Sequence, residues 1–331
     1  MRSEGRFKQL DGLRGVAAII VMLYHYCSVY SSEFHAFIFS PDIFKYGFYG
    51  VELFFVISGF VIYYTIQKIH SPKEFLIKRF IRLFPTYWLC LVITFLVVWI
   101  FPLNEYRNTN FVDGLVNVTM ISGVIHVKYV DPAYWSLQIE LFFYLLMAVI
   151  LLFNKLKHID FILWAWLGLV LIYNEVHKLP GLGLLLNLQF GPLFVAGICF
   201  YRIKTSSQRV WNSYLLLVIS YGCAVRSVHV EESFLGITIV YLVFVFSVFI
   251  KNPVLSSRLL AFFGAISYSL YLIHANVGFV LMRILQTNGF NAPYLIIIPI
   301  GFSIFLSWII TFYFEKPLMA WLNKKLIKQS D

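Results

Sequence analysis

Long apolar runs dominate this 331-residue chain and alternate with short polar, mostly basic segments. A helix of about 20 apolar residues crosses the roughly 30 Å hydrocarbon core of a bilayer. Runs of this kind lie near residues 13–31, 47–66, 84–102, 135–153, 159–175, 182–201, 211–228, 234–250, 259–282 and 293–314. The pattern predicts an all-α polytopic membrane protein with about ten transmembrane helices. Residues 111–127 carry several polar side chains, and we interpret them as a re-entrant or interfacial segment on the outer side.

The placement of basic residues predicts the orientation of these helices. If the N-terminus is cytoplasmic, twenty of the 26 lysines and arginines fall in inner segments. The outer six are Lys45, Arg107, Lys128, Lys178, Arg226 and Arg283. This positive-inside bias places both termini in the cytoplasm and the chain in the inner (cytoplasmic) membrane. The net charge of +10 is thereby explained by topology and anionic lipid, so nucleic acid is not an expected partner.

Composition supports a single membrane domain over residues 1–331. The chain is 60% hydrophobic and 13% charged, whereas soluble domains carry about 25% charged residues. Its four cysteines all fall in apolar runs and lack metal-ligand spacing, so we interpret them as packing residues. We expect no bound metal, no disulfide and no cleavable signal peptide.

The first run, residues 10–26, contains ionisable residues at two depths. Asp11 and Arg14 stand at its mouth, and His25 lies deep inside it. On an α-helix, Arg14 and His25 project within roughly 20° of each other and lie about 16 Å apart along the axis. An ionisable group near the bilayer centre is a functional candidate by default. A hydrogen-bonded structural histidine is the competing interpretation, with about equal weight.

A pair of arginines precedes the third run at the inner membrane surface. Arg79 and Arg82 share one helical face, because they are three residues apart, and Lys78 is adjacent. Arginine offers a planar fork to phosphate oxygens, so the pair is a candidate phosphate clamp. The alternative is two snorkelling interface anchors, which the spacing alone favours.

The fourth run introduces a carboxylate from the outer side. Trp135 opens this run, and Glu140 lies five residues further, about 8 Å into the core at helical rise. Glu140 thus approaches the depth of His25 from the opposite side. An unpartnered carboxylate in lipid is costly, so we expect a cationic or hydrogen-bonding group to face it.

The ninth run carries a polar stripe. Ser267, Tyr271 and His274 recur at i, i+4 and i+7 on one face, with Tyr268 adjacent. Such stripes commonly hold helices together. However, three separate runs now bring titratable groups to one depth, which favours a shared polar site.

These motifs resemble those of the acyltransferase-3 family of integral membrane O-acyltransferases. The resemblance spans nearly the whole chain. It rests on Asp11-Gly12-Leu13-Arg14-Gly15 followed by His25, on GVELFFVISGF at residues 50–60, on Arg79-x-x-Arg82 before Pro85 and Tyr87, on Trp135-Ser136-Leu137 with Glu140, on SYSLYL at residues 267–272 with His274, and on Glu315-Lys316-Pro317. It implies a ten-span enzyme that moves an acyl group, usually acetyl, from cytoplasmic acyl-CoA to a hydroxyl of a cell-envelope glycan. The chain resembles the members without an extracytoplasmic domain, which leaves the need for a partner protein open.

The resemblance also implies roles for individual residues. The positions of Arg14, His25, Arg79 and Arg82 are functionally important in the family, and His25 matches its catalytic group. We expect acetyl-CoA phosphates at Arg79 and Arg82, with Lys78 and Arg14 as further cofactor-binding residues. His25 then acts as general base or accepts the acyl group first.

Other residues are expected to support this chemistry. Asp11 would lie about 21 Å from His25 on a straight helix, so Glu140 or a tyrosine of the ninth run is a better orienting partner. Ser267, Tyr268 and Arg14 are candidates for stabilising the oxyanion. Supporting or substrate-binding roles are assigned to Asp11, Ser267, Tyr268, Tyr271, His274 and Trp135.

Two other functions fit parts of the pattern. A transporter for a lipid-linked sugar or another solute would use His25, Glu140 and His274 as a proton relay. The chain shows no pseudo-symmetric halves, which weighs against a transporter. A scaffold without chemistry leaves buried His25 and Glu140 unexplained.

Overall fold

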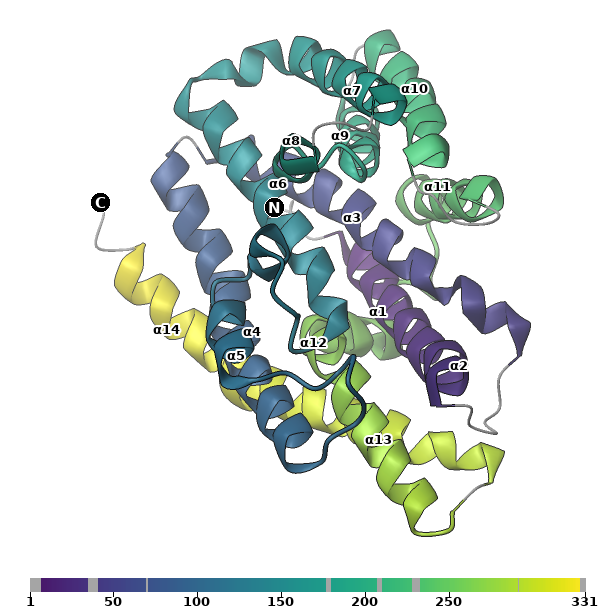
Figure 1. Cartoon of the computed structure of the whole chain (residues 1–331). Helices are drawn as coiled ribbons and strands as arrows, with labels where there is room; N and C mark the ends of the chain where they lie inside the picture. The colour runs from purple at the N-terminus through teal and green to yellow at the C-terminus, as the bar shows by residue number, and fades with distance from the viewer. Residues whose placement is uncertain are drawn as a thin grey trace. The chain divides into compact units, whose positions relative to one another are not determined.

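The computed structural model describes residues 7–34, 41–69, 71–176, 180–206, 210–227, 233–290 and 292–327, and these residues form helices and connecting turns without a β-strand (Figure 1). Among them, seven helical stretches are long and apolar enough to cross a membrane. These are Lys8–Phe34, Asp42–Ile66, Pro72–Ile100, Pro132–Leu152, Lys155–Val176, Arg258–Thr287 and Ile297–Leu326. The predicted all-α polytopic membrane fold is confirmed; the count of ten spans and the cytoplasmic termini remain predictions.

The helices keep the order of the apolar runs. They are α1 (Lys8–Leu23), α2 (Tyr30–Phe34), α3 (Tyr49–Ile66), α4 (Pro72–Ile100), α5 (Phe111–Asn117), α6 (Trp135–Leu152), α7 (Ile159–Val176), α8 (Pro180–Leu185), α9 (Gly191–Thr205), α10 (Trp211–Ser227), α11 (Ser233–Phe249), α12 (Arg258–Thr287), α13 (Ile297–Ile309) and α14 (Lys316–Leu326). Short 3₁₀ turns precede α3, α6, α7 and α13. Two π-helical turns, Tyr24–Val29 and Ile310–Glu315, continue α1 and α13.

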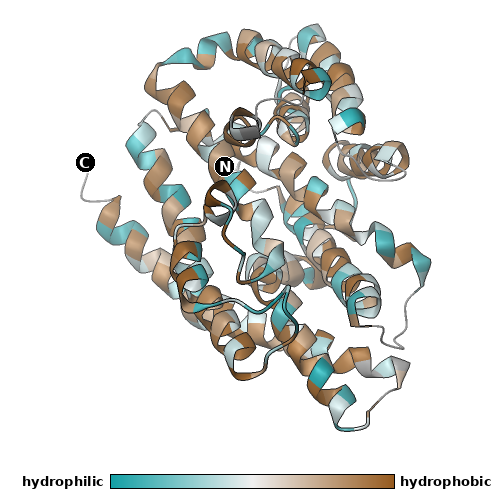
Figure 2. Cartoon of the chain, viewed as in Figure 1, coloured by the Kyte–Doolittle hydropathy of each residue, from teal (hydrophilic) through white to brown (hydrophobic). Residues whose placement is uncertain are grey.

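Hydrophobic residues predominate along the spanning helices (Figure 2), and many of their side chains remain exposed. On α4, Val92, Leu96 and Trp99 recur at i, i+4 and i+7 and are 44–69% exposed. An exposed apolar stripe of this length is costly in water but suits a surface that faces lipid. Within the spans, helical hydrogen bonding satisfies the backbone groups that lipid cannot.

The chain divides into two compact units, each assembled from separate segments. The first comprises Met1–Leu10, Val51–Ile77 and Ile139–Ser256. Within it, α3 and α9 meet through glycines, because a Cβ at Gly59 would strike the backbone of Phe194 and one at Gly197 that of Val56. These glycines therefore let the two helices approach closely.

The second unit comprises Asp11–Gly50, Lys78–Gln138 and Ser257–Asp331. It holds most of α1 and α4 together with α5 and α12–α14, and with them nearly all the predicted site residues. The assignment of the whole chain to one domain remains a prediction. All four cysteines are buried and free, as expected.

Two runs differ from the simplest expectation. Residues 182–201 do not form one helix: α8 ends at Leu185 and α9 begins at Gly191. Asn187 in the intervening turn has a φ of 50°, and its amide donates to Ile139 O at 2.8 Å. Residues 111–127 form α5 and the 3₁₀ turn Ser122–Ile125, both too short to cross a bilayer.

Candidate active site

The centre of the candidate site is a pair of histidines in the second unit. His25 Nδ1 lies 3.1 Å from His274 Nε2, and the two ring centroids are 4.8 Å apart. His274 is completely buried, whereas His25 keeps part of its surface accessible. The partly exposed ring of His25 is therefore in contact with the fully buried ring of His274.

Backbone carbonyls determine which ring nitrogens carry hydrogen. A carbonyl oxygen only accepts, so a ring nitrogen beside one must be an N–H. His274 Nδ1 lies 2.9 Å from both Leu270 O and Tyr271 O, and His25 Nδ1 lies 2.9 Å from Val21 O. Each neutral ring therefore carries its hydrogen on Nδ1. His274 Nε2 then accepts from His25 Nδ1–H, and the lone pair of His25 is on Nε2.

Close packing of α1 on α12 brings the histidines together. A Cβ on Gly15 would lie 2.7 Å from Gly264 N, and a Cβ on Gly264 would strike Asp11 O. The offset of 249 residues between His25 and His274 also separates Gly15 from Gly264. The two helices therefore run parallel and in register, with both histidines ten residues beyond the glycine contact.

A buried tyrosine fixes the same helices just beyond the histidines. Tyr26 donates through its hydroxyl to His274 O at 2.7 Å and contacts Ser303 Oγ on α13 at 2.7 Å. Its ring occupies the space beside Gly278 that a side chain there would fill. His25 and Tyr26 both belong to the π-helical turn Tyr24–Val29, a helical irregularity frequent at functional sites.

The predicted basic clamp contains an ion pair that the sequence analysis did not predict. Arg82 donates to Glu315, whose other carboxylate oxygen accepts from Ser269 Oγ at 3.0 Å. Glu315 is 3% exposed and ends the second π-helical turn. The guanidinium also lies 5.1 Å from the centre of the Tyr268 ring. Arg82 thus ties α4 to α12 and α13, whatever else it binds.

The other predicted cofactor-binding residues lie on the same helices. Lys78 and Arg79 are half-buried on α4, one helical turn before Arg82. Arg14 is half-buried on α1, one turn after Asp11. Their phosphate-binding and entrance roles remain predictions.

The residues of the polar stripe in the ninth run bond to different partners. Tyr271 donates to Ala133 O at 2.9 Å and contacts Ser136 Oγ at 2.7 Å. Tyr268 donates to Leu83 O at 2.9 Å, and Ser267 donates to Gly264 O at 2.9 Å within its own helix. These three side chains bond to backbone or to neighbouring elements, as expected of a stripe that holds helices together. Trp135 is half-buried at the first position of α6.

Glu140 belongs to the first unit. It accepts from Ser58 Oγ at 2.9 Å and from the Tyr144 hydroxyl, so the expected hydrogen-bonding partners are present. Glu52, on the same helix as Ser58, is also buried, and its Oε2 finds no hydrogen-bond partner among the described residues. The catalytic role assigned to Glu140 remains a prediction. Within the second unit, His274 supplies the orienting contact to His25.

Sequence reasoning missed a buried cluster next to the histidines. Arg107 is 4% exposed and forms a two-pronged ion pair with Glu33, through Nε to Oε1 at 2.8 Å and Nη2 to Oε2 at 2.7 Å. Its Nη1 donates to Asn276 Oδ1 at 2.6 Å, and its guanidinium lies 4.3 Å from the centre of the Phe279 ring. Arg107 was counted only as an outer charge. No local spacing links it to residues 33 and 276.

The fold and these contacts define a polytopic membrane protein with a buried histidine pair. Comparison with known proteins gives the family. Residues 7–313 match the Acyltransferase domain family, and the chain belongs to it. The predicted family and enzyme class are confirmed, and this membership favours an acyltransferase over the transporter alternative.

Several relatives share part of the sequence. ORF330 of Acidianus two-tailed virus, which has a provisional acetyltransferase name, is 24% identical over 79% of this chain and 80% of its own length. The peptidoglycan O-acetyltransferase OatA of Listeria monocytogenes is 30% identical over 52% of this chain, and the O-acetyltransferase OatA of Staphylococcus aureus is 30% identical over 44%. These two matches span 29% and 24% of the OatA proteins. No solved structure matches the chain.

Proposed function

We propose that this protein transfers an acetyl group from cytoplasmic acetyl-CoA to a hydroxyl of a cell-envelope glycan, with His25 Nε2 as the reacting nitrogen. The observation that carries the proposal is the hydrogen bond between His25 Nδ1 and His274 Nε2. It leaves the lone pair of this partly exposed ring on Nε2. Family membership and the acetyltransferase names of the relatives support the reaction class.

In the direct route, His25 is a general base. Nε2 removes the proton of the acceptor hydroxyl while that oxygen attacks the thioester carbonyl. The carbon–sulfur bond then breaks, and the leaving CoA thiolate takes the proton from Nε2. While Nε2 holds this proton the ring is positively charged, and its Nδ1–H donates to His274 Nε2. That bond orients the ring and stabilises its charge, as the third member of a catalytic triad does.

In the relay route, His25 Nε2 attacks the thioester carbonyl itself and CoA leaves as the thiolate. The acyl-imidazolium keeps its hydrogen on Nδ1, again bonded to His274. After CoA has departed, the acceptor hydroxyl attacks the acyl carbon, loses its proton to water, and the carbon–nitrogen bond breaks to free the neutral ring. A relay predicts ping-pong kinetics, whereas the direct route requires a ternary complex.

The donor is expected to bind from the basic side of the second unit. Lys78 and Arg79 lie on α4 beside Arg82, so several cations are available to the phosphates of CoA. The Arg82 charge is opposed by Glu315. Arg79, Lys78 and Arg82 are together the candidates for phosphate contact. A cytoplasmic donor also fits the positive-inside prediction.

The test is acetyl transfer by the purified protein in lipid nanodiscs. Labelled acetyl-CoA and a panel of glycans are supplied, and both CoA release and acetylated product are measured. We expect His25→Ala to lose transfer while its melting temperature and elution profile remain those of the wild type. His158→Ala, which changes an exposed histidine before α7, is the matched control. Absence of transfer by the wild type contradicts the function, and wild-type rates for His25→Ala contradict the histidine's role.

A further inference from the structure

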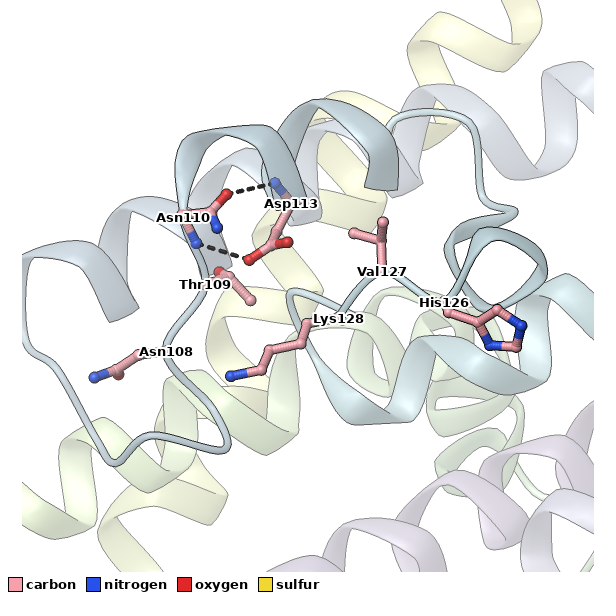
Figure 3. A pocket seen from close by; sticks show the side chains of 7 residues that line it. All are labelled: Asn108, Thr109, Asn110, Asp113, His126, Val127 and Lys128. Carbon is pink, nitrogen blue, oxygen red and sulfur yellow. Dashed lines mark hydrogen bonds between the residues drawn. The ribbon is translucent and has the colours of Figure 1, made fainter.

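A pocket of about 490 Å³ lies in the segment between α4 and α6. Two stretches of chain line it, and Figure 3 shows their side chains around the start of α5. The lining residues are Asn108, Thr109, Asn110, Asp113, His126, Val127 and Lys128. Six of these seven side chains carry hydrogen-bonding groups, and the set includes both donors and acceptors. Its volume lies within the range of small-molecule sites.

Hydrogen bonds fix both walls of this pocket. Asn110 Oδ1 accepts from Asp113 N, and Asp113 Oδ2 accepts from Asn110 N, both at 2.9 Å (Figure 3). Asn117 Nδ2 donates to Asp113 O and to Lys128 O, both at 2.7 Å, and thereby joins one wall to the other. A site built in this way loses little conformational entropy when it binds a ligand.

Polar groups in the pocket retain bonding capacity. Thr109 Oγ1 is buried, and the described residues offer it no hydrogen-bond partner. The reciprocal cap uses one oxygen of Asp113 and only the oxygen of the Asn110 amide. A buried hydroxyl without a partner costs free energy that a ligand hydroxyl would recover. The pocket thus offers an amide N–H group and a carboxylate oxygen, with the unpartnered Thr109 hydroxyl buried in its wall.

The same segment is fixed to the helix that carries His274. Arg107, the residue before Asn108, donates to Asn276 Oδ1 on α12 at 2.6 Å and pairs with Glu33 beyond α1's π-helical turn. Asn276 in turn donates through Nδ2 to Val130 O at 2.8 Å and through its backbone N–H to Asp131 Oδ2 at 2.9 Å. Both ends of the pocket segment therefore bond to Asn276, which is two residues beyond His274 on α12.

We propose that this pocket is the acceptor subsite and that it binds a sugar unit of a polyhydroxylated glycan. The inference rests on the proposed acetyl transfer, because that reaction requires a glycan hydroxyl at His25 Nε2. Hydroxyls that both donate and accept suit the mixed lining, whereas the Asp113 carboxylate disfavours a phosphate or another polyanion. Tyr106 and Phe111, which flank the 108–110 stretch, are 86% and 70% exposed and offer faces for sugar rings.

Binding is tested without acetyl-CoA, so the result does not depend on catalysis. Chitopentaose and maltopentaose are titrated onto the full chain in nanodiscs and followed by saturation-transfer NMR. Thr109→Val keeps the side-chain shape but removes the hydroxyl, and we expect about three- to tenfold weaker glycan binding. Thr119→Val is the matched control, because Thr119 is exposed and its hydroxyl bonds only to nearby backbone, donating to Val116 O at 2.6 Å and accepting from Ile121 N at 3.4 Å.

A second variant covers the case in which Thr109→Val fails to fold. Asp113→Asn keeps an oxygen for the cap but removes the charge, and it should also weaken glycan binding. The subsite is contradicted if the wild type binds neither glycan, if both variants bind like Thr119→Val, or if inorganic phosphate displaces the glycan. Glycan binding without acetyl transfer would instead contradict the proposed function and leave the subsite in place.

Discussion

Gly15 and Gly264 lie backbone to backbone where α1 crosses α12, with no space for a side chain on either residue. Each lies ten residues before one histidine of the pair, about 15 Å along its helix. Small residues let two helices in lipid approach closely. The distance between His25 and His274 is thus set by a contact nearly three turns away.

Gly264→Ala should separate the two helices and weaken the histidine pair. The added Cβ would strike Asp11 O, which is backbone and cannot rotate away. We expect a loss of about 1–3 kcal/mol in stability and at least a tenfold lower kcat. Gly222→Ala, at a position in α10 with open space around it, is the control. Equal kcat and melting temperature for the two variants would contradict this role of the glycine contact.

His274→Leu should lower kcat without a matching change in the KM for acetyl-CoA. Leucine removes the acceptor of the His25 Nδ1–H, although Val21 O still accepts from it, so we expect a loss of about 10–100-fold. His274→Gln offers a side-chain oxygen to the same hydrogen and should recover part of the rate. Nitrogen-15 NMR of labelled histidine reports the Nδ1–H tautomer directly. An unchanged tautomer and kcat in His274→Leu would assign His274 to packing alone.

The helices and faces that carry the two histidines were predictable, but the pairings between distant residues were not. Helical periodicity places Tyr271 and His274 on one face, and hydropathy identifies the helices that carry them. His25 and His274 are 249 residues apart, and Arg82 and Glu315 are 233 apart, so no local pattern links them. From depth along regular helices, Glu140 or a tyrosine is the expected partner of His25, and His274 is only a supporting residue. In the structure, however, a π-helical turn begins at Tyr24 and changes the direction of later side chains.

Arg82 and Glu315 are expected to depend on each other. Arg82→Gln leaves a carboxylate that is 3% exposed without its cation, which costs about 3–5 kcal/mol in comparable buried pairs. The double variant Arg82→Gln with Glu315→Gln removes both charges and should recover most of the melting temperature. If the pair is structural, the KM for acetyl-CoA recovers as well. If the double variant is stable but still binds acetyl-CoA poorly, Arg82 binds the CoA phosphates and its role is not only structural.

Arg79→Ala should weaken the binding of acetyl-CoA, because it removes a contact to the CoA phosphates and leaves the thioester contacts unchanged. Loss of a charge-assisted hydrogen bond costs about 1.5–3 kcal/mol, so we expect the KM for acetyl-CoA to rise tenfold or more. Acetyl-pantetheine has the same thioester but no phosphates, and its kcat/KM should not change. Arg226→Ala is the matched control, since Arg226 pairs with Glu175 on the exposed surface of the first unit. If Arg79→Ala lowers kcat/KM equally for both donors, Arg79 acts on the fold or on the reaction centre, and the phosphate assignment is wrong.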